Sequence, residues 1–202
     1  MNLVDGTPPL LLCYFLGGLS PSWLAVKCLA GKDLRDCGTG TLGATNAGRV
    51  LGRKVYVIVA LVDILKGWSA MWIAEMMGLQ GWWLFAAGLA AALGHVWPAL
   101  LKFKGGKGMA PAYGVILFSA PWAALLMWLV FGAGRLALRN TTLGAMQAFL
   151  AAPLLAISLA IPLVGLEAGS ALFAALALLL FWTHWQNIKT ALQRRKAEAA
   201  SP

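Results

Sequence analysis

Residues 170–181 read SALFAALALLLF, and this run decides the class of fold. Its residues do not alternate between apolar and polar, as the strands of a membrane barrel must, so a helix is the structure that satisfies its backbone in lipid. Crossing a bilayer takes ~20 helical residues. The chain has five apolar stretches of about that length, at residues 8–26, 55–74, 82–101, 143–164 and 168–185.

Composition points the same way. Hydrophobic residues make up 60% of the 202 residues and charged residues only 11%, whereas soluble domains average ~25% charged residues. This excludes an ordinary soluble domain. We predict an all-α membrane protein that forms a single domain over residues 1–202.

The net charge of +9 is unevenly distributed along the chain. Every Lys and Arg except Lys66 falls in one of four segments, at residues 27–54, 102–107, 135–139 and 189–196. Cytoplasmic loops of membrane proteins collect such residues. We therefore predict an inner-membrane protein with these segments on the cytoplasmic face, and we attribute the charge to orientation, lipid head groups and anionic ligands rather than to nucleic acid.

Placing all four basic segments on one side requires seven crossings, with the amino end outside and the carboxyl end in the cytoplasm. The chain between Lys107 and Arg135 must then cross twice, and prolines at 111 and 121 divide it. We predict short fourth and fifth helices at about 109–119 and 122–134, turning near 119–121. The alternative is one span over 112–131 and six crossings, which would separate the basic segments.

The first segment with chemical character is DCGTGTLGATNAGR, residues 36–49. Its glycines let backbone N–H groups approach an anion, its hydroxyl and amide side chains add donors, and Arg49 adds a fixed charge. An ordinary turn-forming loop is the alternative, and the density of donors favours a phosphate site. The candidate ligands are Thr39, Gly40, Thr45, Asn46 and Arg49.

The second such segment is KFKGGKGMA, residues 102–110. Gly106 and Gly108 flank Lys107 immediately before a predicted helix start, where unpaired N–H groups and the helix dipole attract anions. The segment is not a Walker A loop, because Leu101 stands where the first glycine would be and no Ser or Thr follows Lys107. A nucleotide hydrolase is excluded, and a basic loop that only sets orientation is the alternative.

Ionisable side chains inside the spans are costly and mark function or pairing. Asp63 and Lys66 lie three apart on one helix face, and we predict an ion pair that supports the site. His95 lies near the inner end of its span. His184 and Asn187 share a face at the end of the last span, at the predicted depth of both loops. Neither these residues nor the cysteines have metal-ligand spacing, so we expect no metal and no cofactor.

Taken together, these segments resemble the bacterial integral-membrane acyl-phosphate:glycerol-3-phosphate acyltransferases. That family shows GSGNxGATNxxR, DxxKG, GHxxPxxxxFKGGKG and a terminal HxxN. This chain has GTGTLGATNAGR at 38–49, DILKG at 63–67, GHVWPALLKFKGGKG at 94–108 and HWQN at 184–187. The order and spacing agree over essentially the whole chain.

The resemblance implies transfer of a fatty acyl group from acyl phosphate to the 1-hydroxyl of glycerol 3-phosphate, giving lysophosphatidic acid. It implies substrate contacts by Arg49, Lys107, His184 and Asn187, with Thr39 in place of the family's Ser. It also implies backbone donors at Gly106 and Gly108 near the acyl phosphate, beside Thr45 and Asn46. The only partners expected are the two substrates and membrane lipids, and the protein is expected to act as a monomer.

Departures from the family pattern bear on the acceptor. The family's loop Asn is Thr41 here, an Arg-x-x-Ser-x-x-Ser element appears as Arg139, Thr142 and Ala145, and Thr190 follows the HxxN motif. A divergent acyltransferase acting on another polyol phosphate is one alternative. An organic-phosphate transporter is the other, although the chain has no internal repeat. The motifs pair no Ser or Cys with a His, so no covalent acyl-enzyme is expected.

Overall fold

The computed structural model describes residues 3–158 and 166–200, and this part of the chain contains helices and no strands. The all-α prediction is confirmed. In chain order the helices are α1 (Leu3–Gly18), α2 (Pro21–Ala30), the 3-10 helix η1 (Leu34–Asp36), α3 (Ala44–Leu51), α4 (Arg53–Met76), α5 (Gly81–Val96), the 3-10 helix η2 (Ala99–Leu101), α6 (Met109–Ser119), α7 (Pro121–Leu138), α8 (Thr141–Ser158) and α9 (Leu166–Ala200).

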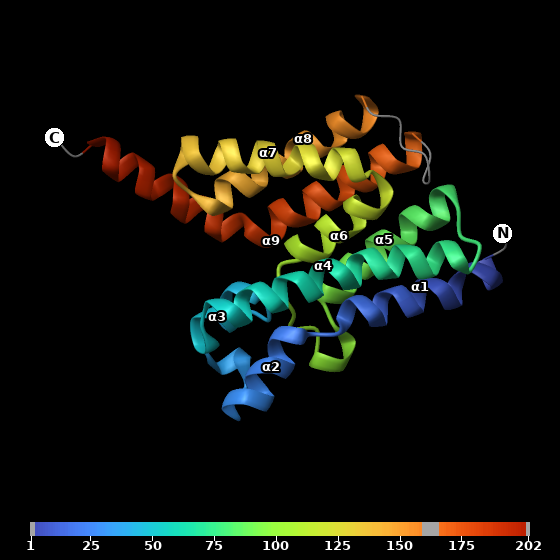
Figure 1. The fold of residues 1–202 in the computed structure, drawn as a ribbon, viewed down its shortest axis with the longest axis horizontal. Coiled ribbons are helices and arrows are strands. Elements are labelled where there is room, and N and C mark those ends of the chain that lie inside the picture. Colours follow the sequence, from blue (N-terminus) through green and yellow to red (C-terminus); the bar gives the residue numbers. More distant parts are fainter. Residues whose placement is uncertain (1–2, 159–165, 201–202) are drawn as a thin grey trace.

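Two groups of long helices lie side by side in Figure 1. In one group α1 packs along α5 and α4 packs along α6; in the other, α7 and α8 form a hairpin that packs against α9. Contacts from α9 to α5 and α6 join the groups. The α4–α6 crossing is close enough to need glycine on both helices, because a Cβ on Gly67 would collide with the Pro111 carbonyl oxygen and one on Gly114 with the Ile64 carbonyl oxygen.

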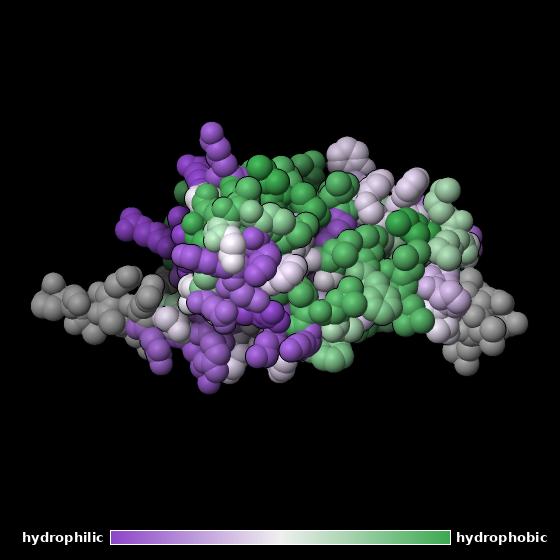
Figure 2. Space-filling view, turned by 90° about the horizontal axis from the view of Figure 1, so that it is seen from below, coloured by the Kyte–Doolittle hydropathy of each residue, from purple (hydrophilic) through white to green (hydrophobic). Residues whose placement is uncertain are grey.

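The outer surface is that of a membrane protein. Five segments are long and apolar enough to cross a bilayer, and two shorter helices are also apolar. Large apolar side chains such as Leu61, Leu129 and Leu178 are exposed on the outside, where lipid would cover them. Figure 2 shows hydrophilic residues gathered toward one end of the visible face and hydrophobic residues over most of the rest.

The first apolar stretch is not the single continuous helix that the sequence predicts. It breaks after α1, and α2 begins at Pro21, which has no N–H to continue the ladder. The Ser20 side chain instead accepts a hydrogen bond from the Trp23 N–H at 3.3 Å and caps the new helix. The break leaves the Leu19 carbonyl without the i+4 partner that an unbroken helix would provide.

The boundaries of α6 and the start of α7 agree with the prediction, whereas the end of α7 does not. Helix α6 covers 109–119, and the turn to α7 falls at Ala120 between Ser119 and Pro121. The prediction that the fifth helix is short was wrong, because α7 continues to Leu138 and has 18 residues. No proline or glycine-rich stretch interrupts it, so helix propagation carries it to the αL residue Arg139.

Candidate active site

Asn46 shapes the first glycine-rich loop from within. Its side-chain amide donates to the carbonyl oxygens of Leu34 (3.3 Å), Cys37 (2.9 Å) and Thr41 (3.1 Å). Its amide oxygen accepts the Thr39 N–H at 3.0 Å. Asn46 is only 1% exposed, so its polar atoms serve the loop rather than a ligand. The sequence predicts a direct phosphate contact, and the geometry makes Asn46 a positioning residue instead.

Other hydrogen-bond donors of this segment are not bonded to Asn46 and lie at the surface. The hydroxyls of Thr39 and Thr41 lie 2.9 Å apart and both residues belong to the accessible surface of the loop. Gly40 adopts φ +69°, a conformation that suits glycine. Thr45 and Arg49 are exposed on α3, which follows directly.

The second loop is joined to the first. The Leu42 N–H donates to the Gly105 carbonyl oxygen at 3.1 Å, and the Gly106 N–H donates to the His95 carbonyl oxygen at 3.0 Å. Gly108 then caps α6 with φ +87°. The sequence correctly predicted a helix amino end directly after Lys107.

Helix α9 closes the third side of the site. The Thr183 hydroxyl donates to the Lys107 carbonyl oxygen at 2.9 Å, so α9 holds the second loop directly. His184 is 5% exposed, and its Nδ1 lies 3.0 Å from the Leu180 carbonyl oxygen. A carbonyl can only accept, so Nδ1 carries the ring proton and Nε2 keeps a lone pair. Asn187 is exposed one turn further on.

Electrostatic coupling shows that the predicted residues converge. Burial lowers the pKa of Lys107 below that of an ordinary lysine, and the nearby Arg49 charge lowers it further. The Lys107 charge also acts on His184. Arg49 and His184, which belong to two other segments, therefore both lie within electrostatic range of Lys107. Among the residues whose side chains the structure describes, neither Arg49 nor Lys107 has a carboxylate in salt-bridge range.

Arg35 lies in the same first loop region but is already neutralised. Its guanidinium donates two hydrogen bonds to the Asp33 carboxylate, at 3.0 and 2.6 Å. These hydrogen bonds hold the pKa of Asp33 far below its usual range. In this region Arg35 is therefore paired with Asp33, whereas Arg49 is available to bind an anion.

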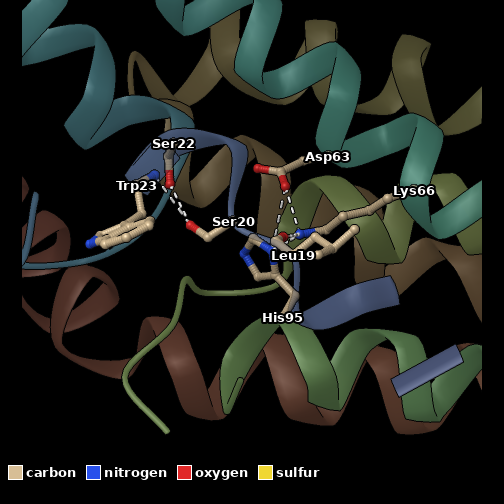
Figure 3. Close-up of polar contacts among 7 residues, drawn as sticks. All are labelled: Leu19, Ser20, Ser22, Trp23, Asp63, Lys66 and His95. Carbon is tan, nitrogen blue, oxygen red and sulfur yellow. Dashed lines mark hydrogen bonds and ion pairs between the residues drawn. The ribbon is translucent and has the colours of Figure 1, made fainter. Parts of the chain in front are cut away.

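A buried polar cluster lies behind the second loop (Figure 3). Lys66 Nζ lies 2.8 Å from Asp63 Oδ1, which confirms the predicted ion pair. The same nitrogen lies 2.8 Å from His95 Nδ1 and donates to the Leu19 carbonyl oxygen at 2.5 Å. The carbonyl freed by the α1–α2 break is therefore the partner of a buried lysine.

Sequence reasoning missed two contacts of the site, and one predicted residue is not joined to it. Thr183 was missed, although a hydroxyl beside His184 in an apolar helix was a usable signal. The Leu42 N–H left no signal, because backbone contacts between loops depend on the fold. Arg139 is exposed at the end of α7, and none of the contacts described above between the two loops and α9 involves it.

The sequence of this chain is similar to known proteins over most of its length. The family model described as glycerol-3-phosphate acyltransferase matches residues 9–194. A glycerol-3-phosphate acyltransferase of Thermus thermophilus is 38% identical over 180 residues, which cover 89% of this chain and 88% of that protein. That of Geobacter metallireducens is 40% identical over 178 residues, covering 87% and 88%.

Solved structures agree over the whole fold. The glycerol 3-phosphate form of an integral-membrane glycerol 3-phosphate acyltransferase matches with a TM-score of 0.84 at 34% identity, covering 94% of this chain and 93% of that one. The lysophosphatidic acid form matches with a TM-score of 0.81 at 31% identity and the same coverage.

Proposed function

Because this chain belongs to the glycerol-3-phosphate acyltransferase family and is an acyltransferase, we propose that the joined glycine-rich loops and α9 form its active site. There a fatty acyl group passes from acyl phosphate to the 1-hydroxyl of glycerol 3-phosphate, giving lysophosphatidic acid. Solved relatives in glycerol 3-phosphate and lysophosphatidic acid forms support this acceptor and product.

One observation carries the assignment of the site. Arg49 and Lys107 come from different segments, share one site, and have no carboxylate partner in the part of the chain that the structure describes. Two uncompensated cations repel each other, which disfavours the empty site and favours a bound anion. Both substrates carry phosphate, so the reaction needs this excess of positive charge.

The residues divide between the two substrates. Arg49 offers a bidentate fork and Lys107 a point charge to the acceptor phosphate, with the Thr39 hydroxyl and the Gly40 and Thr45 backbone close by. The N–H groups around Gly106 and Gly108, at the amino end of α6, suit the acyl phosphate and the oxyanion that forms from its carbonyl. Asn46 holds the first loop in shape, and Asn187 lies one turn beyond His184.

The reaction itself is a direct displacement. The acceptor's 1-hydroxyl oxygen attacks the acyl carbonyl carbon, the bond from that carbon to the phosphate oxygen breaks, and inorganic phosphate leaves. The hydroxyl proton passes to His184 Nε2, which has the lone pair, or to the acceptor's own phosphate. Acyl phosphate is already activated, so charge neutralisation and positioning supply the rate without a covalent acyl-enzyme.

The orientation follows from the basic loops. We place seven crossings in the bilayer: α1 with α2, then α4, α5, α6, α7, α8 and α9, with the amino end outside. The active-site loops then lie on the cytoplasmic face of a bacterial inner membrane, where they meet glycerol 3-phosphate from the water and the fatty chain of acyl phosphate can remain in the bilayer. The gathering of hydrophilic surface at one end (Figure 2) supports this arrangement.

The test uses the purified full-length chain with glycerol 3-phosphate and either palmitoyl phosphate or palmitoyl-CoA. We expect lysophosphatidic acid only from palmitoyl phosphate, and a loss of about 100-fold or more in Lys107→Ala. Arg53→Ala removes an exposed arginine just beyond the site and is expected to stay within about twofold of the wild type. Product formed only from palmitoyl-CoA, or full activity in Lys107→Ala, would contradict the proposal.

A further inference from the structure

We propose that His95 is a positioning residue for the acyl-transfer site, held by Lys66 and Asp63 so that it fixes Gly106 and therefore Lys107. The proposal rests on the function proposed above and adds a buried group that acts through the loop rather than on the substrate. It assigns a purpose to three ionisable residues that no contact with substrate explains.

His95 supports Gly106 in two ways. Its carbonyl oxygen accepts the Gly106 N–H at 3.0 Å. Its ring occupies the space beside the Gly106 Cα, since a Cβ placed there would collide with Nε2. His95 is 6% exposed, so the ring is packed in place, and a shift of the ring would be transmitted to the residue before Lys107.

Lys66 sets the orientation of that ring. A lysine ammonium has three donors and no acceptor. Lys66 donates to the Leu19 carbonyl, forms an ion pair with Asp63, and lies 2.8 Å from His95 Nδ1. Nδ1 must therefore accept, which places the ring proton on Nε2, on the side of the loop. Asp63 lies 3.6 Å from the same Nδ1, too far for a hydrogen bond, so the lysine and not the carboxylate orients the imidazole.

The cluster also ties the loop to the helix break (Figure 3). Leu19 precedes the Ser20 cap, Asp63 and Lys66 lie on α4, and His95 lies on α5. Buried ion pairs are poor stabilisers compared with apolar residues of the same size. A cluster that only held the fold together could be replaced by such residues without loss, whereas a cluster that orients His95 could not.

A variant that removes both charges can distinguish a cluster that only stabilises the fold from one that orients His95. The double variant Asp63→Asn/Lys66→Met removes the charges together and leaves no unpaired ion. We expect its thermal unfolding midpoint in detergent to stay within a few degrees of the wild type, while kcat with palmitoyl phosphate falls about tenfold or more because the ring loses its donor. Ser119→Ala, at another buried polar residue with a hydrogen bond inside α6, is the control and should keep its kcat.

His95 itself supplies the second arm. We expect His95→Leu to lose activity while it remains folded. His95→Gln keeps an acceptor for Lys66 and a donor toward the loop, so it should recover a large part of kcat. Activity that follows the unfolding midpoint in every variant, or full kcat in folded His95→Leu, would overturn the inference. Retained activity in Lys107→Ala would instead overturn the proposed function, so the two failures are distinguishable.

Discussion

At the scale of single residues, Arg35 and Arg49 show how the surroundings of a side chain decide its task. Both belong to the region of the first glycine-rich loop and both carry the same guanidinium. Arg35 donates two hydrogen bonds to Asp33, whereas Arg49 is exposed and its charge acts on Lys107. In the proposed site, the charge offered to a substrate phosphate is therefore that of Arg49 and Lys107.

The effect of Arg49 on Lys107 predicts how kcat/KM for glycerol 3-phosphate depends on pH. Lys107 binds phosphate only as an ammonium, and its pKa is lowered by burial and by Arg49. As the pH rises through that lowered pKa, the charge is lost and kcat/KM for glycerol 3-phosphate should fall earlier than an ordinary lysine would allow. Arg49→Gln removes one cause of the shift, so the Lys107 pKa rises and the alkaline fall should move to higher pH, although the absolute rate is lower.

The measurement is kcat/KM for glycerol 3-phosphate from pH 7 upward, with the rate of palmitoyl phosphate hydrolysis without enzyme subtracted. Arg53→Gln lies outside the coupled pair and should leave the alkaline fall where the wild type has it. An unchanged fall in Arg49→Gln, or a shift to lower pH, would show that Arg49 does not act on Lys107.

The sequence carries a signal for some residues of the proposed site and none for others. Arg49 and Lys107 could be proposed as phosphate ligands because glycines and hydroxyls around a cation are a local pattern. Asn46 could not be placed correctly, because an amide beside an anion site and an amide bonded to its own loop have the same sequence. Thr183 acts through the Lys107 carbonyl, 76 positions away along the chain, and such a contact exists only once α9 packs against the loop.

At the scale of helices, the α4–α6 crossing makes a prediction about stability. Gly114→Ala would drive a Cβ into the Ile64 carbonyl oxygen, and Gly67→Ala would do the same at Pro111. Separating two packed backbones costs about 1–3 kcal/mol, so both variants should unfold at a lower temperature. Gly132→Ala in α7 has open space around the new Cβ and should be neutral or stabilising by up to about 1 kcal/mol.

Thermal unfolding in detergent, followed by circular dichroism, compares the three variants directly. Equal midpoints for Gly114→Ala and Gly132→Ala would mean that the two helices do not approach each other as closely as described. Because α6 begins at the Lys107 loop, Gly114→Ala is also expected to reduce activity more than Gly132→Ala does.

Two helices begin at prolines, α7 at Pro121 and α2 at Pro21, and the sequence analysis predicted only the first of these boundaries. Pro121 marks the start of α7, and the turn before it was predicted correctly. The break at Leu19 was missed because Ser20 and Pro21 lie inside a long apolar stretch, where hydrophobicity outweighs local signals. At the break the freed Leu19 carbonyl accepts a hydrogen bond from the buried Lys66, which is 47 residues away.

At the scale of the whole molecule, the lengths of the apolar stretches and the positions of the charges could be read without knowledge of packing. The apolar stretches predicted the class of fold, and the positions of the lysines and arginines predicted that the basic loops gather at one end. The number of crossings depends on whether the stretch over α6 and α7 passes the bilayer twice. The two helices are separated by a turn at Ala120, which favours two crossings over one.

Labelling of single cysteines decides between seven and six crossings. In a background with Cys13→Ala, Cys28→Ser and Cys37→Ser, a reporter cysteine is placed at Gln80, Lys104 or Arg139, all exposed residues outside the long helices. With seven crossings, Lys104→Cys and Arg139→Cys share the cytoplasmic side, and an impermeant maleimide labels only Gln80→Cys in intact spheroplasts. With six crossings, Arg139→Cys is labelled from outside as well. Labelling in inverted vesicles should show the reverse pattern, and activity of each variant confirms that the labelled protein is folded.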